Sequence, residues 1–231
     1  MSTLDTVSGN VVAYAPAAVR GTFVRRAYMH AIGGIVGFAA VEWFLFSSGM
    51  AQPIAQTMLS GSWLLVLGAF MLVSWGATHV AHTVKSVPMQ YLAYAGLVVA
   101  EAIIFVPMLA LAMMKAPGVI ESAAWVTLMG ATGLIVVATV TGKDFSFLRG
   151  MLMWGGILAI VAIVSSVLFG FEMGTWFSVA MIGFAGAAIL YDTSNILHHY
   201  PEDRYVAAGM QLFASIALMF WYVLRLFMSR D

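Results

Sequence analysis

The run MLMWGGILAIVAIVSSVLFG, residues 151–170, contains no ionisable side chain. At about 1.5 Å of rise per residue, a helix of this length crosses the roughly 30 Å hydrocarbon core of a bilayer. Six more stretches of about 18 residues or longer carry at most one or two ionisable groups each. The sequence therefore predicts an all-α membrane protein with seven transmembrane helices.

The composition of the whole chain supports this class. Of the 231 residues, 62% are hydrophobic and only 9% are charged, whereas soluble domains are roughly half apolar and about a quarter charged. We expect a cytoplasmic N-terminal tail over residues 1–25, loosely ordered over its first 20 residues, and a single transmembrane domain over residues 26–231. The predicted helices of that domain cover residues 28–47, 62–83, 90–113, 120–141, 151–170, 176–197 and 206–228.

Charge and residue types exclude several classes of function. The net charge is zero, so the chain has no basic face with which to bind the phosphates of a nucleic acid. It contains no cysteine, which excludes disulfides and thiolate chemistry. Because it has neither a GxSxG nucleophile motif nor a Walker A loop, we expect no enzyme and no cofactor.

The distribution of Lys and Arg predicts the orientation. With the N-terminus in the cytoplasm, seven basic residues face that side and Lys115 faces the other, while the side of Arg225 and Arg230 depends on whether the last helix crosses the membrane. This arrangement fits the preference of basic loops for the cytoplasm. The seven are Arg20, Arg25, Arg26, Lys85, Lys143, Arg149 and Arg204.

Three carboxylates lie within predicted spans: Glu42, Glu101 and Asp192. An ionised acid near the bilayer centre costs about 2.5–3.5 kcal/mol on insertion scales, so each must be protonated, paired or in contact with water. We expect Glu42 to hydrogen-bond a neighbouring helix. Glu101 is the deepest and is a candidate proton carrier. Asp192 lies near the C-terminal end of a helix, where the macrodipole disfavours an acid, so a functional role is favoured there.

Two further patterns have ordinary structural interpretations. His79 and His82 are three residues apart on one helix, a spacing that can bring two imidazoles to one metal ion. No zinc-binding motif accompanies them, so we expect no metal site. Gly33 and Gly37 have the spacing of a close helix contact, which we expect to be intramolecular.

Three segments in the last two-fifths of the chain carry a family likeness: TGKDFSFLRGMLMWG (141–155), GFAGAAILYDTSNILHH (183–199) and GMQLFASIALMFWYVLRLF (209–227). They resemble the Bax inhibitor family, also called the transmembrane Bax inhibitor motif proteins. The bacterial branch that includes modulators of the membrane-bound AAA protease FtsH is the most similar. The resemblance implies a seven-helix fold in which the last helix is central and six wrap around it, in the bacterial inner membrane.

The resemblance also implies a pH sensor in the members that leak calcium. In those members, one aspartate in helix six and one in helix seven share a proton, because two close acids cannot both ionise cheaply. The first aspartate matches Asp192, within LYDTSN, but the second position is Ser215, within LFASIALMF. The hydroxyl of Ser215 can donate a hydrogen bond to Asp192, so the acid pair is broken in this chain.

Two functions follow from the resemblance. The first is a calcium or cation leak, or another role in ion homeostasis, with pH sensing and a calcium ion bound weakly at Asp192. The alternative is a non-conducting regulator of an FtsH-type membrane protease, in which Asp192 and Ser215 form a polar latch between helices six and seven. Family frequency slightly favours the leak, and the local residues favour the regulator. The candidate site residues are Asp192, Ser215, Glu101 and Asn195, with Glu42, Thr193 and His79 as secondary candidates.

Overall fold

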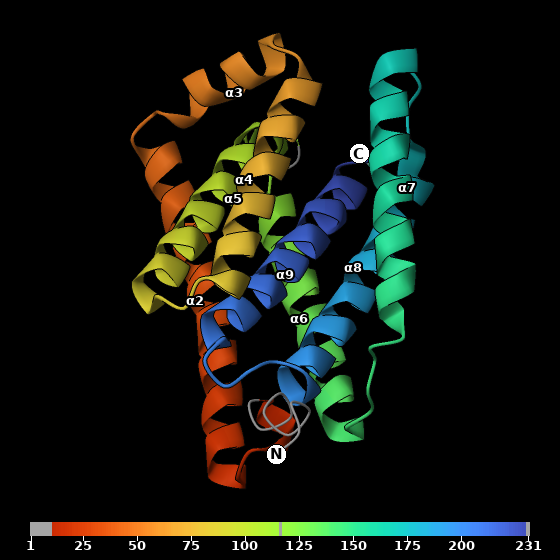
Figure 1. Cartoon of the computed structure of the whole chain (residues 1–231). Coiled ribbons are helices and arrows are strands. Elements are labelled where there is room, and N and C mark those ends of the chain that lie inside the picture. Colours follow the sequence, from red (N-terminus) through yellow and green to blue (C-terminus); the bar gives the residue numbers. More distant parts are fainter. Residues whose placement is uncertain (1–10, 116, 230–231) are drawn as a thin grey trace.

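The computed structural model describes residues 11–115 and 117–229. Over these residues a short 3-10 helix, η1 (Val12–Tyr14), is followed by eight α-helices. Seven of the eight are long and apolar enough to cross a membrane, which confirms the predicted class (Figure 1). The α-helices are α2 (Ala17–Ser47), α3 (Ala51–Ser60), α4 (Trp63–Thr83), α5 (Val87–Lys115), α6 (Val119–Thr141), α7 (Leu148–Phe169), α8 (Gly174–His198) and α9 (Tyr205–Met228).

The first spanning helix is longer than predicted. α2 begins at Ala17, eleven residues before the predicted start at 28, so residues 17–20 are helical and do not belong to a loosely ordered tail. Hydropathy indicates only the apolar part of a helix. Here the helix continues beyond that part because Phe23 and Ala27 are buried in the main hydrophobic core. Residues 1–10 of the expected tail lie outside the described residues.

The sequence analysis missed α3, which connects α2 to α4 (Figure 1). This ten-residue helix buries Ala51, Ala55 and Met58 on one face. Pro53 fits because the N–H groups of a first helical turn have no partner within the helix. A helix too short to cross a bilayer does not produce a strong hydropathy signal, so the segment was interpreted as a connection.

The last helix is the most buried of the spans. In its most apolar 18-residue window, 72% of α9 is buried, whereas none of the corresponding window of α7 is. α9 packs against α2, α4, α5, α6 and α8, while α7 packs against α8 and α4. Figure 1 shows α9 between the group formed by α2, α4 and α5 and the group formed by α6, α7 and α8. Side chains on α9 therefore have neighbours from both groups.

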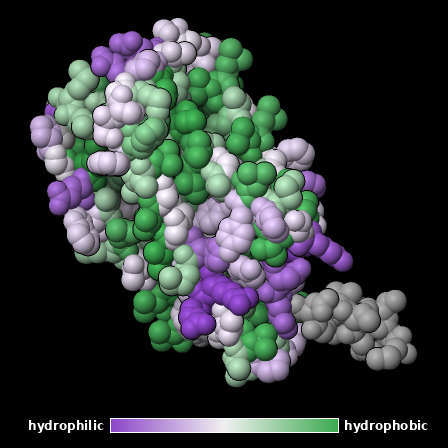
Figure 2. Space-filling model, turned by 90° about the vertical axis from the view of Figure 1, so that its left-hand side faces the viewer, coloured by the Kyte–Doolittle hydropathy of each residue, from purple (hydrophilic) through white to green (hydrophobic). Residues whose placement is uncertain are grey.

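Several connections meet at one end of the bundle, which we call the basic end. The amide of Val12 donates a hydrogen bond to the carbonyl of Tyr200 (2.9 Å). The guanidinium of Arg204 donates to the carbonyl of Val84 (2.6 Å), and Asp144 reaches the C-terminal end of α8. Figure 2 shows hydrophilic residues gathered in the lower part of the molecule, below a largely hydrophobic surface. The basic end comprises residues 11–16, 84–86, 142–147 and 199–204.

Candidate functional site

Asp192 and Ser215 form a buried pair between α8 and α9. Their exposed fractions are 4% and 6%, and the Ser215 hydroxyl donates a hydrogen bond to Oδ2 of Asp192 (2.5 Å). The alignment of the last helix predicts that these side chains face each other, and the hydrogen bond confirms this contact. A buried polar group that loses its partner stays desolvated and unsatisfied, so this hydrogen bond joins the two helices.

A partly open cavity of about 730 Å³ lies beside this pair. Its walls come from α4, α5, α7, α8 and α9, and its polar lining includes Glu101, Asp192, Ser215 and Gln211. Glu101 is buried in the middle of α5. The structure therefore brings three of the four main candidate residues to one cavity.

The fourth candidate, Asn195, acts through its backbone. Its carbonyl accepts hydrogen bonds from the amides of His199 (2.9 Å) and Tyr200 (3.1 Å), which ends α8. Asn195 does not line the cavity. Thr193 is fully buried, and its hydroxyl has no hydrogen-bond partner among the described residues. Both residues therefore lie beside the Asp192 pair without joining the same polar cluster.

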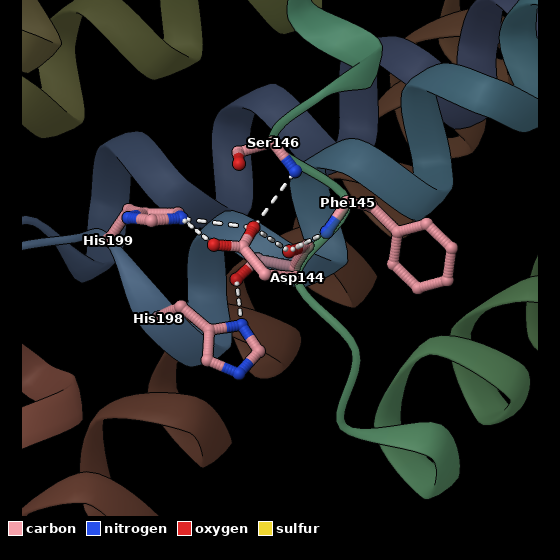
Figure 3. Close-up of polar contacts among 6 residues, drawn as sticks. Asp144, Phe145, Ser146, His198 and His199 are labelled. Atoms are coloured by element: carbon pink, nitrogen blue, oxygen red, sulfur yellow. Dashed lines mark hydrogen bonds and ion pairs between the residues drawn. The ribbon is translucent and has the colours of Figure 1, made fainter.

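A second polar cluster joins the α6–α7 loop to the end of α8, and the sequence analysis did not find it (Figure 3). The Ser194 hydroxyl accepts a hydrogen bond from the amide of Phe145 (2.8 Å) and donates to Oδ1 of Asp144 (3.2 Å). Nε2 of His199 lies 3.0 Å from Oδ2 of Asp144. Gly142 ends α6 in the left-handed conformation (φ 57°), which glycine adopts without strain, and the loop starts there.

The electrostatics of this second cluster stabilise ionised Asp144. The backbone amide of Ser146 donates to its carboxylate (2.8 Å). This hydrogen bond, followed by the contact with His199, lowers the pKa of Asp144 from 3.8 to about 2. The motifs GKDF and TSNILHH are both part of the family resemblance. Their similarity to the family was the only signal of this contact, because residues 144 and 199 lie far apart in the sequence.

Among the secondary candidates, Glu42 differs from expectation, and His79 and His82 have separate contacts. Glu42 is buried on α2, but neither carboxylate oxygen has a hydrogen-bond partner in the described part of the chain, so the expected bond to a neighbouring helix is wrong. His79 is exposed and stacks on Trp75 with ring centroids 5.8 Å apart. His82 instead uses its ring nitrogens to contact the carbonyl of Thr78 and the hydroxyl of Tyr200. Within residues 11–115 and 117–229, no three His, Asp or Glu side chains gather as metal ligands.

The close helix contact expected at Gly33 and Gly37 also differs from the structure. A Cβ atom at Gly33 would meet nothing within 4 Å, and one at Gly37 would meet only Val98 at ordinary contact distance. The close approaches on this side of the bundle are at Gly34 and Gly209. The spacing of Gly33 and Gly37 therefore does not mark a close helix contact within this chain.

Comparisons with known proteins identify a family and several relatives. A family model described as "Inhibitor of apoptosis-promoting Bax1" matches residues 20–231. The modulator of FtsH protease YccA from Escherichia coli (strain K12) is 32% identical over 111 residues, which cover 45% of this chain and 50% of the relative. An uncharacterised membrane protein from Vibrio cholerae is 34% identical over 111 residues, covering 47% of this chain and 49% of the relative. A BI1-like protein from Arabidopsis thaliana is 34% identical over 95 residues, covering 39% and 36%. The chain spans about half the length of the bacterial relatives that it matches.

Proposed function

This chain belongs to the Bax inhibitor family, whose model covers residues 20–231, and from that premise we propose that it regulates a membrane-bound protease of the FtsH class. Seven spanning helices make it an integral membrane protein. A bacterial relative is named as a modulator of FtsH protease. The proposal carries that role over to this chain, with the partner bound through the spanning helices or the basic end.

The observation that carries the proposal is the hydrogen bond between Ser215 and Asp192 (2.5 Å). Two acids at these positions would share a proton and respond to pH as a coupled pair. A serine hydroxyl does not titrate in the physiological range, so this pair holds α8 against α9 without a shared proton. Such a fixed latch suits a regulator that binds a partner better than it suits a pH-gated pore.

The charge distribution supports a cytoplasmic N-terminus as part of the same proposal. Lys85, Lys143 and Arg204 lie in segments of the basic end, and basic loops favour the cytoplasmic side. Lys115 ends α5 at the opposite end of the bundle. The basic end then faces the compartment in which a membrane-bound AAA protease hydrolyses ATP.

The test follows the degradation of a membrane protein that FtsH cleaves, in a bacterial host lacking its own family member. Wild type is expected to slow this degradation in a pulse–chase experiment and to co-purify with the protease. Ser215→Ala is expected to weaken both effects, because it removes the latch. Ser166→Ala is the matched control, since its hydroxyl bonds only the carbonyl of Ile163 in its own helix. Equal degradation rates with and without the chain, and no co-purified protease, would contradict the proposal.

One observation favours a second candidate, a cation leak. Glu101 and Asp192 line the same cavity within the spanning helices, and carboxylate oxygens suit calcium. If this candidate holds, vesicles that carry the protein and a calcium dye will show flux that falls in Glu101→Gln. Flux equal to that of empty vesicles, at both acidic and alkaline pH, would eliminate the leak and leave the protease proposal in place.

A further inference from the structure

The cavity extends well beyond the Asp192 pair. Along α9 its lining runs from Gln211 to Arg225, which is about 21 Å at the rise of an α-helix. This length is more than half of a roughly 30 Å hydrocarbon core. The cavity therefore runs along the spanning direction and has two chemically different ends.

Its side walls are apolar and reach the outer surface of the bundle. Leu152, Gly156 and Ile163 of α7 face residues of α5 and α9 across it. Met153 and Ile160 also line the cavity, yet they are 59% and 38% exposed. Residues that both line a cavity and lie at the surface mark its opening. Because α7 is a spanning helix, this opening faces the lipid.

The end of the cavity far from the basic end has the features of a membrane interface. Trp63 and Trp221 line it and stack, with ring centroids 6.4 Å apart. Tryptophan is enriched where lipid headgroups meet the hydrocarbon core. Arg225 lines the same end, and its guanidinium lies 5.7 Å from the ring of Phe177. Among residues 11–115 and 117–229, no carboxylate lies within 4.0 Å of Arg225.

We propose that this cavity holds one acyl chain of an anionic bilayer phospholipid and that Arg225 binds the lipid phosphate. The chain lies between α7 and α9 along Ile160 and Ile163, and the phosphate lies beside Trp221. This site is separate from the protease proposal, because it uses the opposite end of the cavity from the Asp192 pair.

Three physical arguments select this occupant. The planar guanidinium of arginine matches phosphate geometry with two parallel hydrogen bonds. A largely apolar cavity that opens to lipid gains more from a hydrocarbon chain than from water, which needs polar partners. The volume of about 730 Å³ lies in the range of small-molecule sites, so the cavity takes one chain while the rest of the lipid stays in the bilayer.

The experiment measures how much phospholipid the protein retains. The full chain is reconstituted into phosphatidylcholine vesicles that contain a minor share of phosphatidylglycerol. It is then extracted in mild detergent and weighed intact by mass spectrometry. Wild type is expected to retain one phosphatidylglycerol per chain. Gly156→Phe fills the cavity, and because a Cβ there would lie 3.8 Å from Phe184, α7 can keep its place.

Arg225→Gln is expected to retain roughly tenfold less phosphatidylglycerol, since a lost hydrogen bond to a charged group has about that effect. Gly156→Phe is also expected to retain less, because its ring occupies the space of the acyl chain. The matched controls are Leu158→Phe, on the 64% exposed outer face of α7, and Arg149→Gln, at the other end of α7. Both should retain the lipid as wild type does. Equal retention in wild type and Arg225→Gln would overturn the proposal even if Gly156→Phe fails to fold. Equal loss in Leu158→Phe would overturn it too.

Discussion

At the residue scale, position 215 changes what a buried acid can do. Asp192 is almost inaccessible and has one neutral hydrogen-bond donor at 2.5 Å. Removing a partner from a buried polar group costs more than the bond itself contributes, because the remaining group stays desolvated. The pair therefore stabilises the contact of α8 with α9 whether or not an ion passes nearby.

Ser215→Ala tests that contribution directly. We expect the free energy of unfolding to fall by about 1–3 kcal/mol, since Asp192 is left buried without its donor. Reversible unfolding in mixed detergent micelles, followed by circular dichroism, measures the change. Ser166→Ala removes a hydroxyl that bonds only its own helix and should change stability by much less. Similar losses of stability in the two variants would show that the hydrogen bond to Asp192 contributes no more than a hydroxyl bonded within its own helix.

Sequence reasoning succeeds for this pair and fails for Glu42, for a physical reason. Asp192 and Ser215 fall within motifs whose relative placement the family resemblance implies, so their contact is predictable. Whether a buried acid such as Glu42 meets a donor depends on the rotation of neighbouring helices. Close to Glu42 on α2, Leu45 packs with Ala55 of α3 and Val106 of α5, so the neighbouring helices contribute apolar side chains there. A single sequence does not encode that rotation in its hydropathy.

Asp144 sets the position of the α6–α7 loop, and its pKa gives the pH range in which it acts. Its pKa in the folded protein is lowered from 3.8 to about 2 by the amide of Ser146 and by His199. A lowered pKa means that the stabilisation is fully present above the ordinary value. It is lost as the pH falls from about 4 towards 2. At neutral pH the carboxylate of Asp144 is ionised, so its stabilisation of the loop is fully present.

Asp144→Ala is therefore expected to free the loop at neutral pH. Hydrogen–deuterium exchange should become faster at the amide of Phe145, because Ser194 loses the carboxylate that orients its hydroxyl. Asp203→Ala is the control, since Asp203 is exposed and lies 3.7 Å from its neighbour Arg204; it should leave that amide unchanged. Exchange at Phe145 that stays slow in Asp144→Ala would show that the loop does not depend on this carboxylate.

At the scale of elements, α9 approaches the backbone of α2 closely at Gly209. A Cβ atom at Gly209 would lie 2.6 Å from the carbonyl oxygen of Ala27 and 3.1 Å from the amide of Ala31. These are backbone atoms of α2, so neither can move without shifting the helix. The sequence spacing pointed to Gly33 and Gly37 instead, because a single sequence does not show which face of a helix meets a neighbour.

Gly209→Ala should consequently separate α2 from α9 and destabilise the fold by about 1–3 kcal/mol, the usual cost of overpacking. Gly33→Ala is the matched control on α2, since a Cβ atom there meets nothing within 4 Å. It should be neutral or slightly stabilising, as alanine is the better helix former. Thermal unfolding in the same detergent compares the two. The packing argument fails if both variants unfold alike.

At the scale of the whole molecule, hydropathy predicts the spanning helices well because each must fill the thickness of the bilayer. The same signal does not detect the polar ends of helices or α3, which lie where water replaces hydrocarbon as the solvent. This explains why α2 begins at Ala17 and not at the predicted residue 28, while the later spans lie close to their predicted bounds. Asp192 and Glu101, both candidates from the sequence, line the cavity, whereas Arg225 at its far end was not among the candidates.

The orientation of the bundle is the last prediction, and the lack of any cysteine makes it directly measurable. Lys143→Cys places a thiol in the α6–α7 loop at the basic end, and Ser60→Cys places one at the end of α3. With the basic end in the cytoplasm, a membrane-impermeant maleimide added to intact cells should label Ser60→Cys and leave Lys143→Cys unlabelled. Permeabilised cells, in which both must label, are the control. Labelling of Lys143→Cys in intact cells would place the basic end outside. It would also contradict binding of a cytoplasmic protease there, because the loops that carry Lys85, Lys143 and Arg204 would then face the wrong compartment.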